Sequence, residues 1–208
     1  PISDPQTNIT SFIASDESSK EKYGRCEVLR FGNLVHVKKY PELPGIEYLA
    51  SDLAHRLTGY TCSYSSLHKF EGNVPVLISK SVLGTNLQDV LKSQPDFLET
   101  VLDWECFSNH FIRTLFLCPE DDKPDNFVVY YGINNIAKMV CVDNDHSFAV
   151  PMMRGWFGNK LILKSIIFCS KRMSEPLHAN VVERIKQWDC DVLIRQWLDS
   201  AVAADNRN

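Results

Sequence analysis

The sequence lacks the short motifs that identify several common classes of protein. Its 208 residues contain neither a GxGxxG loop nor a Walker A loop, so the two best known glycine-rich phosphate-binding motifs are absent. No two of its seven cysteines have CxxC spacing, which argues against a structural zinc site. No apolar run has the roughly 20 residues that a membrane-spanning helix needs, so we expect no transmembrane segment.

The charge balance and the cysteines narrow the expected partners and compartment. The chain has 22 basic and 26 acidic residues, and its net charge of −4 makes nucleic acid an unexpected partner. The seven cysteines are scattered and odd in number, which indicates reduced thiols and a cytoplasmic location. Hydrophobic residues make up 44% of the chain, enough for a sizeable core in one domain.

One acidic stretch organises the expected functional site. Residues 127–131 and 137–142 are rich in β-branched and aromatic side chains, and Gly132-Ile-Asn-Asn between them predicts a hairpin turn. Because a hairpin begins and ends at the same edge, the residues before it and after it are expected to meet. Five carboxylates and two amides should then converge: Asp121, Asp122, Asp125, Asn126, Asp143, Asn144 and Asp145.

The order of these residues is typical of phosphoryl transfer. Asp121 and Asn126 have Asp-x-x-x-x-Asn spacing, and Asp143 ends a strand after them. In phosphotransferases such an Asp accepts the proton of the attacking hydroxyl, while the Asn and a second Asp bind metal ions. We therefore predict Asp121 as the general base, with Asp122 as its alternative, and Asn126 and Asp143 as ligands of Mg²⁺ or Mn²⁺. A solvated acidic turn is the other interpretation of the stretch.

The same stretch resembles the catalytic segment of two groups of atypical kinases. Asp-x-x-x-x-Asn-Phe, a short hairpin and an apolar strand ending in Asp is the pattern of HipA-type protein kinases and type II phosphatidylinositol 4-kinases. Residues 142–151, Val-Asp-Asn-Asp-His-Ser-Phe-Ala-Val-Pro, are similar to the Ile-Asp-Asn-Gly-Leu-Ala-Phe-Pro segment of the lipid kinases. This resemblance implies an α+β, two-lobed kinase fold that uses ATP. A small antiparallel β lobe would span residues 1–82, and a mainly helical lobe residues 83–208.

The resemblance also implies a nucleotide-binding lysine in the first lobe. Residues 26–40 predict a hairpin in which Val35, Val37 and Lys39 share one strand face, while Lys38 points the other way. Lys39-Tyr-Pro is similar to the Lys-Phe-Pro segment of HipA-type kinases, so Lys39 is the expected phosphate contact and Lys38 its alternative. Glu47, in a helix predicted over residues 45–59, would hold that lysine.

The remaining expectations concern adenine and the C-terminal helices. In the kinase interpretation Ser79 to Val82 connect the lobes and offer backbone groups to the adenine edge. Residues 95–118 predict one long helix stopped by Pro119, and residues 177–188 and 191–203 predict two more.

Three functions are compatible with these residues. The first is an ATP-dependent kinase that phosphorylates Ser or Thr hydroxyls of a protein, with a lipid headgroup as the other acceptor. The second is a pseudokinase that binds a nucleotide or a partner without catalysis, because the glycine-rich loop is missing. The third is a metal-dependent sugar transferase, since Asp143-Asn-Asp145 is an Asp-x-Asp motif.

Overall fold

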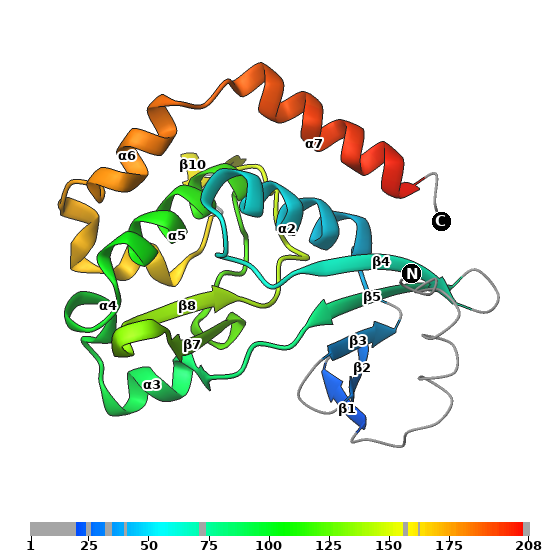
Figure 1. Ribbon diagram of the computed structural model, residues 1–208, viewed down its shortest axis with the longest axis horizontal. Helices are drawn as coiled ribbons and strands as arrows, with labels where there is room; N and C mark the ends of the chain where they lie inside the picture. Colours follow the sequence, from blue (N-terminus) through cyan, green and yellow to red (C-terminus); the bar gives the residue numbers. More distant parts are fainter. Residues whose placement is uncertain are drawn as a thin grey trace.

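The chain folds into a small antiparallel sheet followed by a mainly helical part (Figure 1). This computed structural model describes residues 20–23, 26–31, 35–39, 41–70, 74–155, 158–161 and 163–205. Residues 1–19 lie outside the described residues. The expected α+β fold class, with a small antiparallel β lobe and a mainly helical C-terminal lobe, is confirmed.

The N-terminal sheet has the strand order β1-β2-β3-β5-β4, and every neighbouring pair is antiparallel. Its strands are β1 (Lys20–Tyr23), β2 (Cys26–Phe31), β3 (Val35–Lys39), β4 (Ser65–Phe70) and β5 (Val74–Lys80). The central strand is β3, which pairs with β2 on one side and β5 on the other. The backbone of β3 is therefore paired on both sides, which fixes the position from which each of its side chains extends.

Helix α2 (Pro44–Thr58) connects β3 to β4 and carries the expected apolar stripe. Ala50, Leu53, Ala54 and Leu57 are buried, and Gly59 ends the helix with φ of 75°, a conformation that favours glycine. Glu47 lies in the first turn and is only 2% exposed. A buried carboxylate is unfavourable unless a cation or several donors compensate it, so Glu47 must have a close partner.

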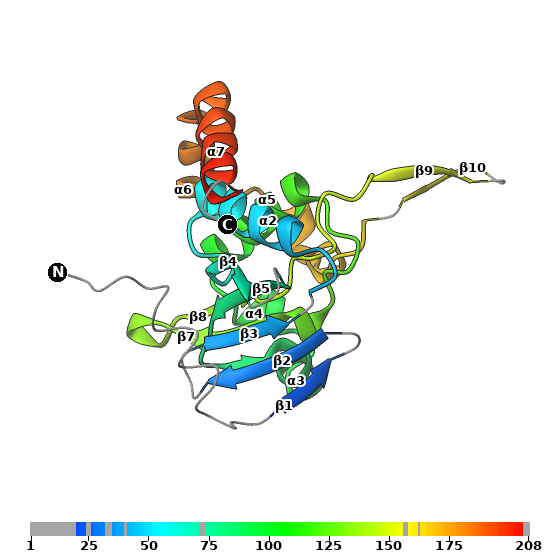
Figure 2. The same cartoon turned by 90° about the vertical axis from the view of Figure 1, so that its right-hand side faces the viewer.

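The C-terminal part is built around the three-stranded sheet β6-β7-β8 and five helices. The strands are β6 (Thr85–Asn86), β7 (Phe127–Tyr131) and β8 (Ala137–Cys141), and the helices are α3 (Leu87–Ser93), α4 (Phe97–Thr100), α5 (Trp104–Leu117), α6 (Ala179–Lys186) and α7 (Cys190–Asp205). Helices α6 and α7 run along the outer edge of the molecule (Figure 1). A ribbon of β9 (Met152–Gly155) and β10 (Gly158–Leu161) projects from the rest (Figure 2).

The single helix expected over residues 95–118 is wrong, because α4 and α5 are separate helices. Asp103 separates them: its carboxylate accepts a hydrogen bond from the Cys106 amide at 2.8 Å and caps α5. The Asp103 amide also donates to the carbonyl of Ala137 on β8 at 2.9 Å. The helix is therefore interrupted at Asp103, where the backbone bonds the sheet instead of the preceding turn.

One apolar core joins the two parts of the chain. Leu57 of α2, Phe107 of α5, and Phe127 and Met139 of the β7–β8 hairpin belong to the same buried cluster. Because α2 follows directly after β3, this core fixes Glu47 and the N-terminal sheet relative to the hairpin. Among the described residues, no helix is long and apolar enough to cross a membrane.

Candidate active site

Lys38 in the middle of the site joins the two parts of the fold. Its Nζ donates to both carboxylate oxygens of Glu47, at 2.7 and 2.9 Å, and to Oδ1 of Asp143 at 2.9 Å. Lys38 comes from β3 and Glu47 from α2, whereas Asp143 follows β8. One ammonium group thus connects the sheet, the helix and the end of the hairpin.

The expected pair between Lys39 and Glu47 is wrong, because Lys38 makes this contact. Strand alternation did separate the two lysines: Lys38 lies opposite Leu77 on β5, and Lys39 lies opposite Val76. Val76 and Leu77 are 2% and 0% exposed, so both faces of the sheet carry buried apolar residues. The apolar neighbours of Lys39 therefore did not mark the face on which Glu47 lies.

Burial and charge act in opposite directions on this ion pair. Burial raises the pKa of Glu47 to about 7, although the attraction of Lys38 opposes the rise. Burial would lower the pKa of Lys38, but the attraction of Glu47 and Asp143 outweighs it and holds that pKa above its ordinary value. The lysine is therefore a permanent cation over a wide pH range, and Glu47 is the member of the pair that titrates near neutrality.

The loop before β7 presents Asp121 and Asn126 beside this cluster. The short 3-10 helix η2 (Pro124–Asn126) turns the chain so that Nδ2 of Asn126 donates to the carbonyl of Asp121 at 2.7 Å. The carbonyl of Asn126 in turn accepts from the amide of Val142 at 2.9 Å, which brings the loop against the residue before Asp143. The predicted base and metal ligands thus lie on two loops that contact one another.

Asp121 keeps an accessible carboxylate. Its side chain is 45% exposed, and Oδ2 lies 3.0 Å from Nζ of Lys123, which also approaches Asp125 at 3.8 Å. The hydrogen bond to Asp121 raises the pKa of Lys123. An exposed carboxylate and an exposed cation therefore lie side by side in this loop.

The expected convergence of five carboxylates is wrong, because Asp122 turns into the interior. It is 2% exposed and forms an ion pair with Arg113 of α5, whose Nη2 is 2.5 Å from Oδ1. Among the residues that the structure describes, no three His, Cys, Asp or Glu side chains gather as a metal-binding group. The acidic side chains are instead distributed over Arg113, Lys123 and Lys38.

Two of the predicted ligand atoms nevertheless fit Mg²⁺. A carbonyl oxygen is an acceptor, so only the NH2 group of the Asn126 side chain can donate to that of Asp121; this contact orients the amide and leaves its Oδ1 for another partner. Asp143 supplies a carboxylate that is 36% exposed. One amide and one carboxylate oxygen suit Mg²⁺, which usually completes its coordination with water and substrate phosphates. Asn126 and Asp143 remain predicted ligands.

Ser79 and Val82 lie where the two parts of the fold are connected. Ser79 is near the end of β5 and is 5% exposed, while Val82 is half-buried in the connection to β6. The Ser79 hydroxyl has no hydrogen-bond partner among the described residues. Their expected contact with adenine stays a prediction.

The sequence reasoning missed Arg113 and Lys123, and it placed Asn144 at the site without its inward orientation. Arg113 lies on the buried face of α5 together with Cys106, His110 and Leu117, and a charged residue on an apolar helix face was a visible signal. Lys123 follows the predicted base by two positions in the same loop. Asn144 had no such signal, because its inward orientation depends on Arg113, whose Nη1 donates to Oδ1 of Asn144 at 3.1 Å.

No family description and no curated protein matches the sequence. Among solved structures, the chain is similar to the Helicobacter pylori proinflammatory kinase CtkA, with 17% sequence identity and a TM-score of 0.41. The match covers 62% of this chain and 57% of the kinase, so the chain spans little more than half of that protein's length.

Proposed function

We propose that the chain is an ATP-dependent phosphotransferase that phosphorylates Ser or Thr hydroxyls of a protein. The observation that carries the proposal is the position of Lys38, which bonds a helix glutamate and the aspartate that ends the hairpin at the same time. A kinase needs this combination, because its lysine must be held by a glutamate and lie next to the aspartate that binds metal.

The N-terminal sheet and α2 would bind and orient the nucleotide. Lys38 is placed to donate to phosphate oxygens, in the role that the sequence had suggested for Lys39. Glu47 holds the amine at 2.7 Å and keeps it from turning away from the site. Ser79 and Val82 would contact adenine through backbone groups.

The two acidic loops would supply the metal ligands and the base. Oxygens of Asn126 and Asp143 would hold Mg²⁺ or Mn²⁺, which would neutralise charge on the phosphates when bound. Asp121 is exposed enough to accept a proton from an acceptor hydroxyl. Lys123, 3.0 Å from Asp121, adds a positive charge where the transferred phosphoryl group would lie.

A protein acceptor agrees better with the sequence than a lipid headgroup. The chain has no cluster of cysteines that could be palmitoylated, since its seven cysteines are scattered from Cys26 to Cys190. The likeness to lipid kinases rests on one segment after the hairpin. A protein hydroxyl is therefore the acceptor that we propose.

The sugar-transferase alternative has weaker support than the kinase. In its Asp143-Asn-Asp145 motif the carboxylate of Asp143 is already bonded to Lys38, and Asn144 is buried against Arg113. The paired strands of the described sheets are all antiparallel, whereas sugar-nucleotide and dinucleotide sites of the doubly wound kind need a parallel sheet. A pseudokinase stays the alternative to the active enzyme.

The experiment is incubation of the chain with Mg²⁺ and labelled ATP, with casein-type protein substrate and, separately, phosphatidylinositol vesicles. Transfer to protein that disappears in Asp143→Asn is the expected result. Transfer to lipid alone would change the acceptor. Nucleotide binding without any transfer or hydrolysis would identify a pseudokinase, and no binding of ATP at all would overturn the proposal.

A further inference from the structure

Arg113 contacts two loops of the site from inside the protein. It lies on α5 and its side chain is 0% exposed. Nη2 bonds Oδ1 of Asp122 at 2.5 Å, and Nη1 donates to Oδ1 of Asn144 at 3.1 Å. The guanidinium is planar and its donors have a fixed geometry, so the two contacts set the positions of Asp122 and Asn144 relative to each other.

One of these partners, Asp122, is itself held by several hydrogen bonds. The second oxygen of Asp122 accepts from the hydroxyls of Ser165 at 2.6 Å and Thr114 at 3.3 Å. The backbone of Asp122 bonds Lys164 and Ile166, at 3.0 and 2.9 Å. Asp122 is thus fixed by its neighbours, and Arg113, which bonds it, fixes Asn144 relative to it.

Each partner of Arg113 is next in the chain to a residue of the proposed mechanism: the proposed base, Asp121, or the proposed metal ligand, Asp143. Asp122 directly follows Asp121, and Asn144 directly follows Asp143. Consecutive Cα atoms are about 3.8 Å apart, so a displacement of Asp122 or Asn144 also displaces its neighbour. We infer that Arg113 is a positioning residue that sets the distance between the Asp121 loop and the Asp143 loop.

The hydrogen bond from Arg113 to Asn144 is not needed to neutralise the buried charge. Asp122 already neutralises the buried guanidinium, and a single ion pair would satisfy the charge. A buried charge that also bonds a second loop favours one relative arrangement of the two loops over others. The positioning role in catalysis rests on the proposed function, but the rigidity of the two loops does not.

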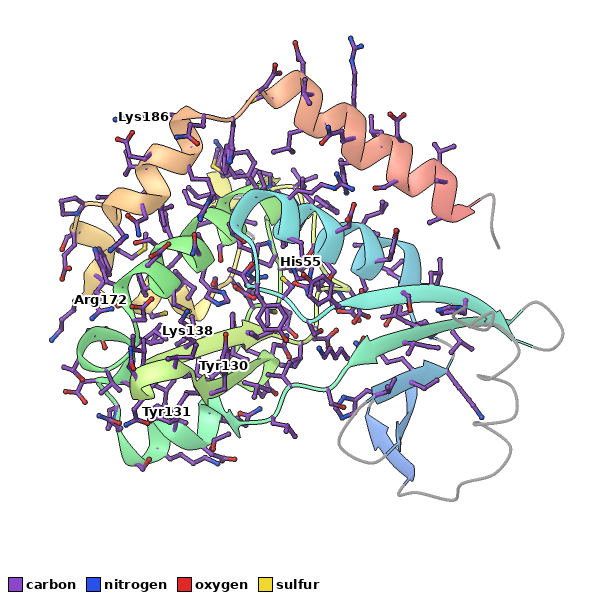
Figure 3. All side chains as sticks on the ribbon, viewed as in Figure 1. His55, Tyr130, Tyr131, Lys138, Arg172 and Lys186 are labelled. Atoms are coloured by element: carbon purple, nitrogen blue, oxygen red, sulfur yellow. The ribbon has the colours of Figure 1, made fainter. Side chains whose placement is uncertain are left out.

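The chain offers a matched control for Arg113. Arg172, labelled in Figure 3, also makes a hydrogen bond inside the protein, to the carbonyl of Leu102 at 2.8 Å. Its guanidinium lies over the ring of Trp104. It contacts neither of the two loops in these interactions. Replacement of either arginine by lysine keeps the charge and removes the planar fork.

The first measurement is backbone hydrogen exchange in Arg113→Lys and Arg172→Lys. We expect Arg113→Lys to accelerate exchange of residues 121–126 and 143–147 by about tenfold or more, because the single ammonium of a flexible lysine does not reproduce the two fixed donor directions of the guanidinium. Arg172→Lys should leave both loops unchanged. Unchanged exchange in the loops of Arg113→Lys, or an equal acceleration throughout α5 and β8, would overturn the inference.

Asn144→Ala keeps the measurement decisive if Arg113→Lys does not fold. It removes the second contact and leaves the ion pair with Asp122. We expect faster exchange in residues 143–147 and a higher Mg²⁺ requirement for ATP binding, with a smaller loss of thermal stability than in Arg113→Lys, because only the Nη1 contact of Arg113 is removed. A proportional loss of stability and binding would show a merely structural role. The two proposals can fail separately. If exchange accelerates only in these loops while the wild-type protein transfers no phosphate, the proposed function is wrong but the positioning of the loops by Arg113 stands.

Discussion

Lys38 and Asp143 are 105 residues apart in the sequence, and their side chains lie 2.9 Å apart in the fold. The same ammonium group bonds Glu47 of α2, so three elements meet at one cation. This relationship makes Lys38, and not Lys39, the lysine that bonds Glu47 and Asp143, and it brings the end of the β7–β8 hairpin to the N-terminal sheet. Tyr130 and Tyr131, labelled in Figure 3, mark the opposite end of β7 from Asn126.

Lys38→Met should weaken Mg²⁺–ATP binding by roughly tenfold or more, because it removes charge-assisted hydrogen bonds to phosphate. Lys39→Met is the matched control on the neighbouring position of the same strand, and we expect its dissociation constant to stay within about twofold of the wild type. Isothermal titration of both variants measures the difference. A stronger effect of Lys39→Met would show that the nucleotide lies on the other face of β3.

Asp121→Asn and Asp122→Asn should separate catalysis from stability. Asp121 is exposed, so its replacement should lower phosphate transfer by about a hundredfold or more and leave folding unchanged. Asp122 pairs with buried Arg113, so its replacement should lower the free energy of unfolding by about 3–5 kcal/mol. Transfer rates at saturating ATP and urea unfolding give the two numbers. Full activity of Asp121→Asn would remove it as the base.

Asp143→Asn should abolish most of the thermal stabilisation that Mg²⁺ and ATP confer together. A ligand selective for the folded state stabilises it by RT ln(1 + [L]/Kd), and the loss of a metal ligand raises Kd and so lowers this stabilisation. Asp125→Asn is the control, because Asp125 belongs to the same acidic stretch but only approaches Lys123 at 3.8 Å. Differential scanning fluorimetry with and without Mg²⁺ reads the shift. Equal shifts in both variants would exclude Asp143 from the metal site.

The pH dependence of stability should show the titration of Glu47. Its pKa of about 7 exceeds the ordinary value of 4.5, so between these pH values the folded chain binds a proton that the unfolded chain has released. The free energy of unfolding therefore falls as pH rises through this window, by up to about 1.4 kcal/mol per pH unit. The free energy of unfolding is measured in urea at several pH values for the wild type and for Glu47→Gln. The difference between the two should change with pH by this slope. A flat difference would mean that Lys38 outweighs burial.

Local sequence patterns predicted the regular elements near the site. The apolar stripe and Gly59 placed helix α2, and the two β-branched runs around residues 132–135 placed the β7–β8 hairpin. The break at Asp103 was not predicted, because its capping bond and its contact with Ala137 compete with an otherwise continuous apolar helix pattern. Local propensity describes a segment in isolation, and here a sheet hydrogen bond outweighs it.

By itself the sequence determined the fold class, the order of Asp121, Asn126 and Asp143, and the opposite directions of Lys38 and Lys39. Only the tertiary structure decided which lysine meets Glu47 and which carboxylate turns inward. Strand alternation distinguishes two faces but does not say which face a distant helix covers. The inward turn of Asp122 likewise needs the cation of Arg113 from α5. Both choices depend on contacts between elements, and such contacts form only when the chain packs.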